Sequence, residues 1–306
     1  MFAGAMLVAL VVDATVGWPA WLYRRIGHPV GWIGALIAAL DRRWNKEPAR
    51  RPKGLAAAVL VIAAAAGAGW VVQALLPGGW IGALLTGMLA WPLVAVRSMH
   101  DHVRAVWLPL AAGDLAGARN AVSMIVGRDP SRLDRPAIAR AAIESLAENT
   151  SDGIVAPLFW GAIFGLPGIA GYKAVNTLDS MIGHRTPRHE AFGWAAARID
   201  DIANLIPARL TGAIFAAVAG RAAPFRIMVR DARRHRSPNA GWPESAMAGA
   251  LGVRLSGPRI YADRIADEPW LNAEAPDPTA HDLGRALALY RRGMVLLAAL
   301  LAVLAI

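Results

Sequence analysis

Residues 55–96 read LAAAVLVIAAAAGAGWVVQALLPGGWIGALLTGMLAWPLVAV and contain no acidic or basic residue. A Pro-Gly-Gly turn at 77–79 separates two apolar segments, 55–76 and 80–97, and the second ends with Arg97 just past the uncharged stretch. An α-helix rises about 1.5 Å per residue, so about 20 apolar residues cross the hydrocarbon core of a bilayer. We therefore predict that the two segments are transmembrane helices joined by this turn.

Two further apolar segments, 2–18 and 290–306, lie at the ends of the sequence. The chain is 56% hydrophobic and 18% charged, whereas soluble domains are about 25% charged. Asp13 interrupts the first segment and no basic residue precedes it, so we interpret this segment as a retained span rather than a signal peptide. The sequence predicts an all-α, polytopic integral membrane protein, a single membrane-embedded domain over residues 1–306 with about four firm transmembrane helices.

The segments 154–171 and 202–220 are apolar but interrupted by proline, glycine or polar residues. If both cross the membrane fully, residues 172–201 lie outside the cell. If both are re-entrant or buried among other helices, the polar motifs around them share the cytoplasmic side. We favour the second arrangement, because irregular backbone at membrane depth is tolerated where protein or a wet cavity covers it.

Lys and Arg are concentrated in three regions of the sequence and are absent from the 77–79 turn. The positive-inside rule makes these regions cytoplasmic and places the N-terminus outside; they are 18–54, 98–150 and 221–289. In the first region, residues 28–45 predict an amphipathic surface helix anchored by Trp32 and Trp44. The net charge of +10 follows mainly from this topology, and nothing indicates nucleic-acid binding. The absence of cysteine excludes disulfides and thiolate chemistry.

Three acids follow one another near the end of a predicted helix that begins with Asp134 as N-cap. Glu144 and Glu148 are four residues apart and share a helix face, and Asp152 follows just past the helix. Carboxylates stacked in this way suit Mg²⁺, which prefers hard oxygen ligands and bridges to phosphates. The alternative is that Arg140, four residues before Glu144, pairs with it on a solvated helix.

A second polar cluster combines a lysine with amide, hydroxyl and carboxylate groups: Tyr172, Lys173, Asn176, Thr177 and Asp179. A lysine acts as a point charge beside phosphate, and Asn, Thr and Asp oxygens suit metal or phosphate groups. The alternative is a lysine that snorkels from the end of a helix. The cluster as a whole favours a functional site.

A third group contains Asp200, Asp201, Asn204 and Arg209. Asp201 and Asn204 are three residues apart, so they share a helix face. The alternative is structural, with Asp200 as an N-cap and Asp201 as a first-turn acid. Further along, a loop that contains Asn239 leads into a helix predicted to begin at Pro243, and such a helix N-terminus can receive an anion.

Several familiar catalytic and nucleotide-binding patterns are absent. The seven histidines show no HxxxH spacing, so a zinc site is not indicated. The sequence has no GxxxxGK[ST], no GxGxxG and no GxSxG. Any nucleotide must therefore bind in a pocket of another kind.

Five blocks of the sequence resemble one family closely. They are HPVGWIGALIAALDRRWN (28–45), RAAIESLAENTSDGIVAPLFW (140–160), GLPGIAGYKAVNTLDSMIGHR (165–185), FGWAAARIDDIANLIPARL (192–210) and SPNAGWPESAMAGALGVRLSG (237–257). Together they are similar to the adenosylcobinamide-phosphate synthase family of cobalamin biosynthesis, in the same order and over roughly residues 10–290.

The resemblance implies an integral inner-membrane enzyme, with its active site facing the cytoplasm, that joins adenosylcobyric acid to aminopropanol phosphate or aminopropanol. The amide would form at the expense of ATP with Mg²⁺, so the implied partners are a corrinoid, an amino alcohol phosphate, ATP, lipid and other corrinoid-assembly membrane proteins. The carboxylates implied as metal ligands or bases are Glu144, Glu148, Asp152, Asp179 and Asp201. The cations implied near phosphates are Lys173 and Arg209, and the polar contacts to substrates are Asn149, Asn176, Thr177, Asn204 and Asn239.

The chain departs from the family pattern at two places. Gly17-Trp18-Pro19 stands where the family often has Gly-Asp-Pro, and His184 stands where it has a tyrosine. An acid is therefore missing beside the first span, and we give residues 13–19 little catalytic weight.

Two other functions compete with amide ligation. A membrane phospho-alcohol transferase also binds Mg²⁺ with clustered acids, but its DGxxAR signature is not met after Asp152-Gly153. A transporter or scaffold would distribute polar residues over several spans and show repeat symmetry. Here the polar residues are concentrated between residues 144 and 209.

Overall fold

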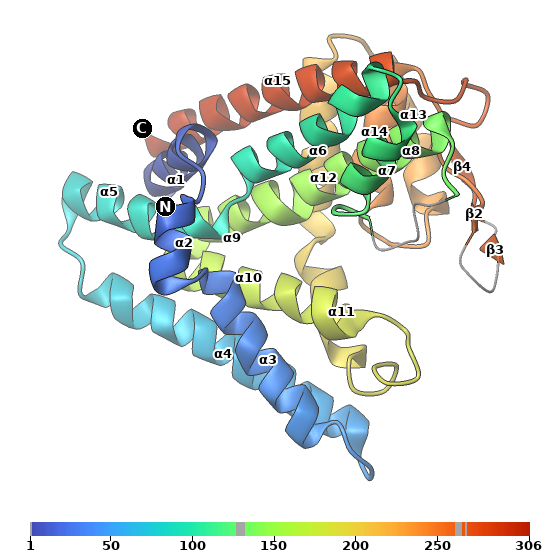
Figure 1. Cartoon of the computed structure of the whole chain (residues 1–306). Coiled ribbons are helices and arrows are strands. Elements are labelled where there is room, and N and C mark those ends of the chain that lie inside the picture. The colour runs from blue at the N-terminus through green and yellow to red at the C-terminus, as the bar shows by residue number, and fades with distance from the viewer. Residues whose placement is uncertain (1, 127–131, 261–264, 267) are drawn as a thin grey trace. The chain divides into compact units, whose positions relative to one another are not determined.

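The structure, a computed structural model, describes residues 2–126, 132–260, 265–266 and 268–306. Its secondary structure is almost entirely helical, which confirms the all-α prediction (Figure 1). The α-helices are α1 (Ala3–Thr15), α2 (Ala20–Ile26), α3 (Pro29–Trp44), α4 (Arg50–Ala74), α5 (Gly79–Ala90), α6 (Val96–Ala111), α7 (Leu115–Val122), α8 (Arg135–Thr150), α9 (Ala156–Phe164), α10 (Leu166–Leu178), α11 (Trp194–Ala203), α12 (Leu205–Val218), α13 (Ala223–Asp231), α14 (Gly241–Leu251) and α15 (Ala280–Ala305).

Shorter elements connect these helices. Two are 3-10 turns, η1 (Trp91–Leu93) and η4 (Ala232–Arg234), and two are π-helical turns, η2 (Ser151–Val155) and η3 (Asp179–Gly183). Two-residue strands form two antiparallel pairs, β1 (Leu255–Ser256) with β4 (Trp270–Leu271) and β2 (Arg259–Ile260) with β3 (Ile265–Ala266).

The chain divides into two compact units, and each is described by itself. Unit 1 comprises Met1–Ala95, Asp152–Asn204 and Ala298–Ile306. Unit 2 comprises Val96–Ser151 and Leu205–Leu297. The single membrane-embedded domain stays a prediction.

Among the described residues, three helices are long and apolar enough to cross a membrane: Arg50–Ala74, Gly79–Ala111 and Ala280–Ala305. They overlap the spans predicted at 55–76, 80–97 and 290–306. The last of them begins well before residue 290. The protein therefore has the several membrane-crossing helices expected of a polytopic membrane protein.

The span predicted at 2–18 is wrong in length. Helix α1 has 13 residues and is about 20 Å long, which is shorter than the hydrocarbon core. Gly17, with a φ of 65°, then turns the chain, and Ala3–Thr15 and Ala20–Trp44 meet at 113°. Only together do these two segments pass as one candidate span, broken or re-entrant.

Gly165 breaks the apolar segment 154–171 into α9 and α10. Its φ of 69° lies in the left-handed region that glycine adopts at little cost. The amide of Leu166 after the break donates to Oε1 of Gln73 on α4, at 2.7 Å. A neighbouring helix thus satisfies a backbone group that lipid cannot. Neither α9 nor α10 is a candidate span, so this segment does not cross as one straight helix.

The segment 202–220 is also interrupted. Helix α11 ends at Ala203 and α12 begins at Leu205, with Asn204 between them. The two helices pass only as a bent pair, either a broken span or a re-entrant loop. The structure thus shows interruption in both ambiguous segments.

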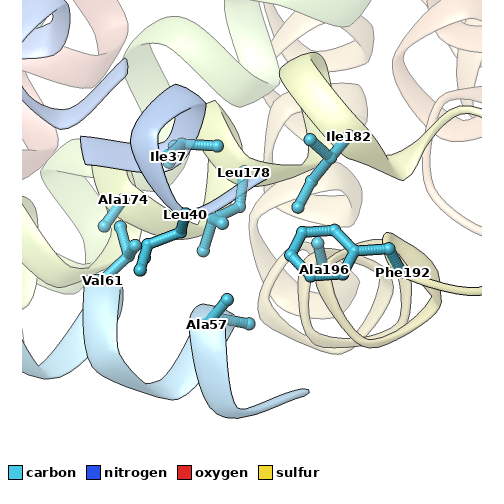
Figure 2. Packing of buried hydrophobic residues seen from close by; sticks show 10 residues of the cluster. Ile37, Leu40, Ala57, Val61, Ala174, Leu178, Ile182, Phe192 and Ala196 are labelled. Atoms are coloured by element: carbon cyan, nitrogen blue, oxygen red, sulfur yellow. The ribbon is translucent and has the colours of Figure 1, made fainter. Parts of the chain in front are cut away.

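The core of unit 1 is built where α3, α4, α10, η3 and α11 meet (Figure 2). Large side chains such as Ile37, Leu178 and Phe192 fill it, and each is at most 1% exposed. Alanines on α4, α10 and α11 let the backbones approach closely, as small residues do in membrane helix pairs. The helix predicted within 28–45 is confirmed as α3, which buries Ile37 and Leu40 and exposes Trp32. Trp44 packs partly buried against the core, and the position of α3 at the membrane surface stays a prediction.

Unit 2 is centred on α14. All its residues but Trp242 are buried, and α12 and α13 pack on it. Helix α8 begins as predicted, because the side chain of Asp134 accepts from Ala137 N at 2.9 Å. Helix α14 begins at Gly241, two residues before the predicted Pro243.

Candidate functional site

Two acids predicted as metal ligands lie in π-helical turns of unit 1. Asp152 lies in η2, and Asp179 begins η3. A π-turn inserts an extra residue into a helix, widens it and re-aims the side chains around it. Such turns are rare and are frequently found at functional sites. The backbone therefore singles out the same two carboxylates that the sequence did.

Lys173 is a buried cation in unit 1. It lies on α10 with 9% of its surface exposed, and Asp152 and Asp13 are its electrostatic partners. Burial lowers the pKa of Lys173 to about 8, while the two carboxylates oppose that shift. A lysine that is only 9% exposed does not extend its ammonium group to water, so the snorkelling alternative is wrong for this residue.

A hydrogen-bonded chain runs beside this lysine. The hydroxyl of Tyr172 donates to Oδ1 of Asn204 at 2.8 Å, and Nδ2 of Asn204 donates to Oδ2 of Asp200 at 3.0 Å. Tyr172 and Asn204 are buried, and indole Nε1 of Trp160 donates to the Ala203 carbonyl. The chain fixes the end of α11 against α10. Asn204 thus bonds Asp200, not the Asp201 with which we predicted it shares a face.

The structural alternative for the two adjacent acids is also wrong. Helix α11 begins at Trp194 after Gly193, so Asp200 and Asp201 lie in its last turn rather than its first. Acids are unfavourable at a helix C-terminus because the macrodipole is negative there. Asp201 receives a bond from Arg198 at 2.8 Å, which offsets part of this cost.

Asp179 and Asp201 are electrostatically coupled. Burial raises the pKa of Asp179, the nearby His184 lowers it and Asp201 raises it. Two coupled carboxylates of this kind favour a shared cation or a shared proton. Asn176 and Thr177 precede Asp179 on α10, and the hydroxyl of Thr177 donates to the carbonyl of Lys173 at 2.6 Å.

Sequence reasoning missed two residues near Lys173. Asp13 on α1 is 4% exposed and coupled to the lysine, although we gave residues 13–19 little weight. His28 is also coupled to Lys173, caps α3 through Nδ1, and packs edge-on against Trp18 with centroids 5.0 Å apart. The signal for His28 was present, because it opens the 28–45 block that carries the family resemblance.

No three His, Asp or Glu side chains gather as a ready-made metal site among the residues that the structure describes. Mg²⁺ does not require such a cage, because it usually takes one or two carboxylates, several waters and substrate phosphates. Asp152 and Asp179 are each a carboxylate of the kind that this mode needs, and one of them is enough for it.

Five predicted site residues belong to unit 2: Glu144, Glu148, Asn149, Arg209 and Asn239. Glu144 is 6% exposed, and its Oε1 accepts from Ser256 N at 2.7 Å, so the alternative of a solvated helix is wrong for it. Arg140 bonds Asp277 at 3.1 Å. Glu148 and Asn149 are exposed on the same helix, and Nδ2 of Asn149 donates to the carbonyl of Ser145.

The other two residues of this group serve structural contacts. The guanidinium of Arg209 lies 4.4 Å from the centroid of the Trp242 ring and donates to the carbonyl of Leu205. Asn239 is buried in the turn before α14, and its backbone N–H donates to the hydroxyl of Ser237. Seven predicted residues therefore lie in unit 1, and these five lie in unit 2.

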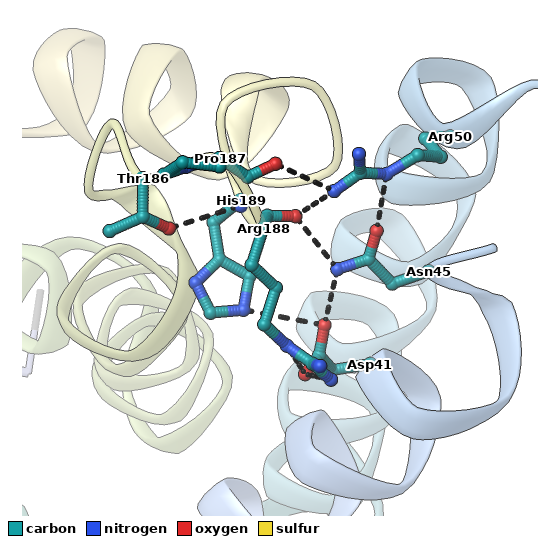
Figure 3. Close-up of polar contacts among 7 residues, drawn as sticks. All are labelled: Asp41, Asn45, Arg50, Thr186, Pro187, Arg188 and His189. Atoms are coloured by element: carbon teal, nitrogen blue, oxygen red, sulfur yellow. Dashed lines mark hydrogen bonds and ion pairs between the residues drawn. The ribbon is translucent and has the colours of Figure 1, made fainter. Parts of the chain in front are cut away.

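The loop between η3 and α11 is tied to α3 and α4 by a polar network (Figure 3). Two guanidinium nitrogens of Arg188 donate to Oδ2 of Asp41, at 2.6 and 3.1 Å. Asn45 donates to Oδ1 of Asp41 at 2.8 Å and accepts from Arg50, and His189 lies 3.4 Å from the same Oδ1. This network positions the loop that joins the two acid-bearing segments of unit 1.

Asp41→Ala should destabilise unit 1 by about 1–3 kcal/mol, because it leaves Arg188 and Asn45 without their shared acceptor. Thermal unfolding in detergent measures this as a fall of a few degrees in Tm. Glu47→Ala is the matched control, since Glu47 is 77% exposed and 3.8 Å from Arg50. Exposed pairs contribute about 0–1 kcal/mol, so equal losses from both variants would contradict the role of Asp41.

Comparison with known proteins decides the family. The sequence model of the CobD/Cbib protein family matches residues 6–290. The chain belongs to this family. It is 67% identical over 308 aligned residues to the cobalamin biosynthesis protein CobD of Rhodobacter capsulatus, covering 99% of this chain and 98% of the relative. The proteins of the same name from Sinorhizobium fredii and Brucella suis are 45% and 47% identical, covering 98% and 96% of this chain and 95% and 94% of theirs.

The family membership confirms the resemblance found in the five blocks. It gives this membrane protein a role in cobalamin biosynthesis. No solved structure matches the chain. The geometry of unit 1 therefore has to be interpreted from its own residues.

Proposed function

We propose that this protein is an ATP-dependent amide ligase that joins adenosylcobyric acid to aminopropanol phosphate, or to aminopropanol, and gives adenosylcobinamide phosphate or its counterpart. Support comes from the membership of the CobD/Cbib family and from the buried Lys173, whose charged form Asp152 and Asp13 favour electrostatically. The buried lysine is the observation on which the chemistry rests. Burying an ammonium group costs free energy, and binding anionic substrate groups beside it offsets that cost.

The reaction balances in two steps, by analogy with ATP-dependent amide ligases. A corrinoid carboxylate attacks the γ-phosphorus of ATP, which gives an acyl phosphate and ADP. The amine then attacks the acyl carbon, the carbon–oxygen bond to phosphate breaks, and the nitrogen gives up a proton. Both steps gather negative charge on oxygen atoms, so positioned cations lower their barriers.

The residues of unit 1 divide these tasks. In this proposal, the positive charge of Lys173 stabilises the oxygens of the γ-phosphate of ATP and of the corrinoid carboxylate that attacks it. Asp179, whose pKa is raised by burial, is suited to accept the proton that the amine loses. Asn176 and Thr177 contribute polar contacts beside it. Asp152 or Asp179 would hold Mg²⁺ together with substrate phosphates, and the bound ion would neutralise charge on the phosphate oxygens.

The proposed site faces the cytoplasm of a bacterial inner membrane. The support is the concentration of Lys and Arg in 18–54, which includes the helix α3 that packs on α10. ATP is made on that side. The two alternatives, a phospho-alcohol transferase and a transporter, have no observation in unit 1 that favours them.

The test is a direct assay of the purified protein in detergent. It is incubated with ATP, Mg²⁺ and adenosylcobyric acid, and with each of the two amines in turn, and corrinoid products are separated by chromatography. We expect a corrinoid amide and one ADP per amide. If neither amine is incorporated by a well-folded preparation, the ligase proposal is refuted.

The dependence of the rate on pH should report the protonation state of Lys173. We expect the protonated ammonium to be the active form, so the rate falls as the pH rises through about 8, the pKa to which burial lowers this group. Asp152→Asn removes a charge that favours the ammonium, so the fall should move to lower pH. The substrate amine also loses a proton as the pH rises, so the effect of Lys173 is read from the ratio of the Asp152→Asn rate to the wild-type rate at each pH. A ratio that does not change through pH 8 would contradict this role.

A further inference from the structure

Unit 2 contains a cavity that the proposed chemistry does not use. Its volume is about 360 Å³, and it is lined by Arg221, Arg285 and Arg292 together with alanine and leucine residues. No acidic residue is among the described residues that line it. Three guanidinium groups around one small cavity favour an anionic ligand, and arginine is the residue best suited to phosphate.

Two of the arginines are held by the end of α14. Arg221 donates to the carbonyls of Gly249 and Ala250, at 3.2 and 2.8 Å. Arg285 donates to the carbonyl of Leu251 at 2.9 Å and to Oδ1 of Asp282 at 2.8 Å. Each guanidinium has five N–H groups, so both retain donors after these bonds are made. The cavity is therefore preformed by side chains that also cap a helix.

Arg292 is different, because it is exposed and has no side-chain bond within the described part of the chain. It also lines a second cavity of about 400 Å³, together with Ala288, Arg291 and Val295. Val295 is 70% exposed. The two cavities share Ala288 and Arg292. Along α15, the arginines therefore lie at one end of the combined cavity and Val295 lies at the other.

The position of these cavities on α15 fits the boundary of a membrane. Helix α15 is a candidate span, and the sequence after Arg292 contains no charged residue up to Ile306. Arginines at the cytoplasmic end of a span lie at the level of the lipid headgroups. Basic pockets at this level bind anionic headgroups.

We propose that this cavity binds the phosphate of an anionic phospholipid, with the lipid's apolar part along Val295. The shared chemistry is a phosphate group, which a soluble phosphate also offers. The apolar continuation along α15 favours the lipid, because a free phosphate gains nothing from it. This proposal does not depend on the ligase proposal, because none of the cavity residues is assigned a role in the ligase reaction.

The experiment measures lipid retention by the full-length protein. Protein reconstituted with phosphatidylcholine and phosphatidylglycerol is extracted in mild detergent, and the lipid that stays bound is identified by native mass spectrometry. Wild type should retain phosphatidylglycerol in preference to phosphatidylcholine. Arg292→Gln should weaken that retention about tenfold, which corresponds to the loss of one charge-assisted contact, and Arg292→Lys should weaken it less.

Arg226→Gln is the matched control, since Arg226 is an exposed arginine of the same unit that lines neither cavity. It removes the same charge and should leave retention unchanged. Equal losses in the two glutamine variants would show only diffuse charge attraction and overturn the proposal. Equal retention of the two lipids would overturn it as well. So would binding of inorganic phosphate alone by wild-type protein with no retained phosphatidylglycerol, because the occupant would then be free phosphate.

Discussion

Lys173→Met should lower the rate of amide formation by about 10²–10³-fold, the loss typical of removing one preorganised electrostatic group from an active site. Methionine has a similar length and no charge, so Asp13 and Asp152 lose the cation that they share. Corrinoid amide formed per mole of protein measures the effect. Lys173→Arg should not restore the rate, because the larger guanidinium does not fit a site where lysine is already 9% exposed.

The control for this prediction is Lys46→Met, which removes an exposed lysine from the same unit. It should keep a rate near that of wild type. Because Lys173→Met can also perturb folding, Lys173→Ala is tested with small alkylammonium ions added to the assay. Partial recovery of the rate with these ions supports a local charge effect. A well-folded Lys173→Ala protein with an unchanged rate would show that the lysine has no catalytic role.

Asp179→Asn should lower the rate about 10²-fold and raise the Mg²⁺ concentration needed for half-maximal activity. Asparagine keeps the shape of the side chain but can neither take up a proton nor hold a cation by charge. Removal of one carboxylate near a bound metal weakens its affinity by about 10–100-fold. Titration of the rate with Mg²⁺ at saturating ATP separates the two effects.

Glu190→Gln is the matched control for Asp179, since Glu190 is an exposed acid of the same unit. It should leave both the rate and the Mg²⁺ requirement unchanged. Glu148→Ala tests the acid of α8 that the sequence predicts as a metal ligand. If Glu148 is a ligand, this variant should lose turnover as Asp179→Asn does. If Asp179→Asn leaves the Mg²⁺ requirement as it is in wild type, the proposed metal role of Asp179 is wrong.

Much of the fold could be predicted from local sequence. The uncharged stretch of 55–96 specifies two membrane helices, since few other structures accept so many consecutive apolar residues. Asp134 before Pro136 specifies the start of α8, because an N-cap acts within one helical turn. The amphipathic pattern of 28–45 likewise specifies α3.

The remainder depends on contacts between distant segments. Helix α1 ends at Thr15, and sequence alone cannot show that Asp13 then lies beside Lys173 on α10. The π-turns that carry Asp152 and Asp179 have no local signature, because they arise where packing forces an extra residue into a helix. The structural alternative for the acids of α11 places them at the wrong end of a helix, since Gly193 is a weaker start signal than Asp200.

The bond between Gln73 and Leu166 has a consequence for biogenesis. The acceptor is synthesised 93 residues before the donor, so the whole of α4 is made before the broken segment leaves the ribosome. A chain that lacked Gln73 would release this kink into lipid with an unsatisfied amide, which costs several kcal/mol. The order of translation therefore means that the acceptor on α4 is already present when the Leu166 amide needs a hydrogen-bond partner.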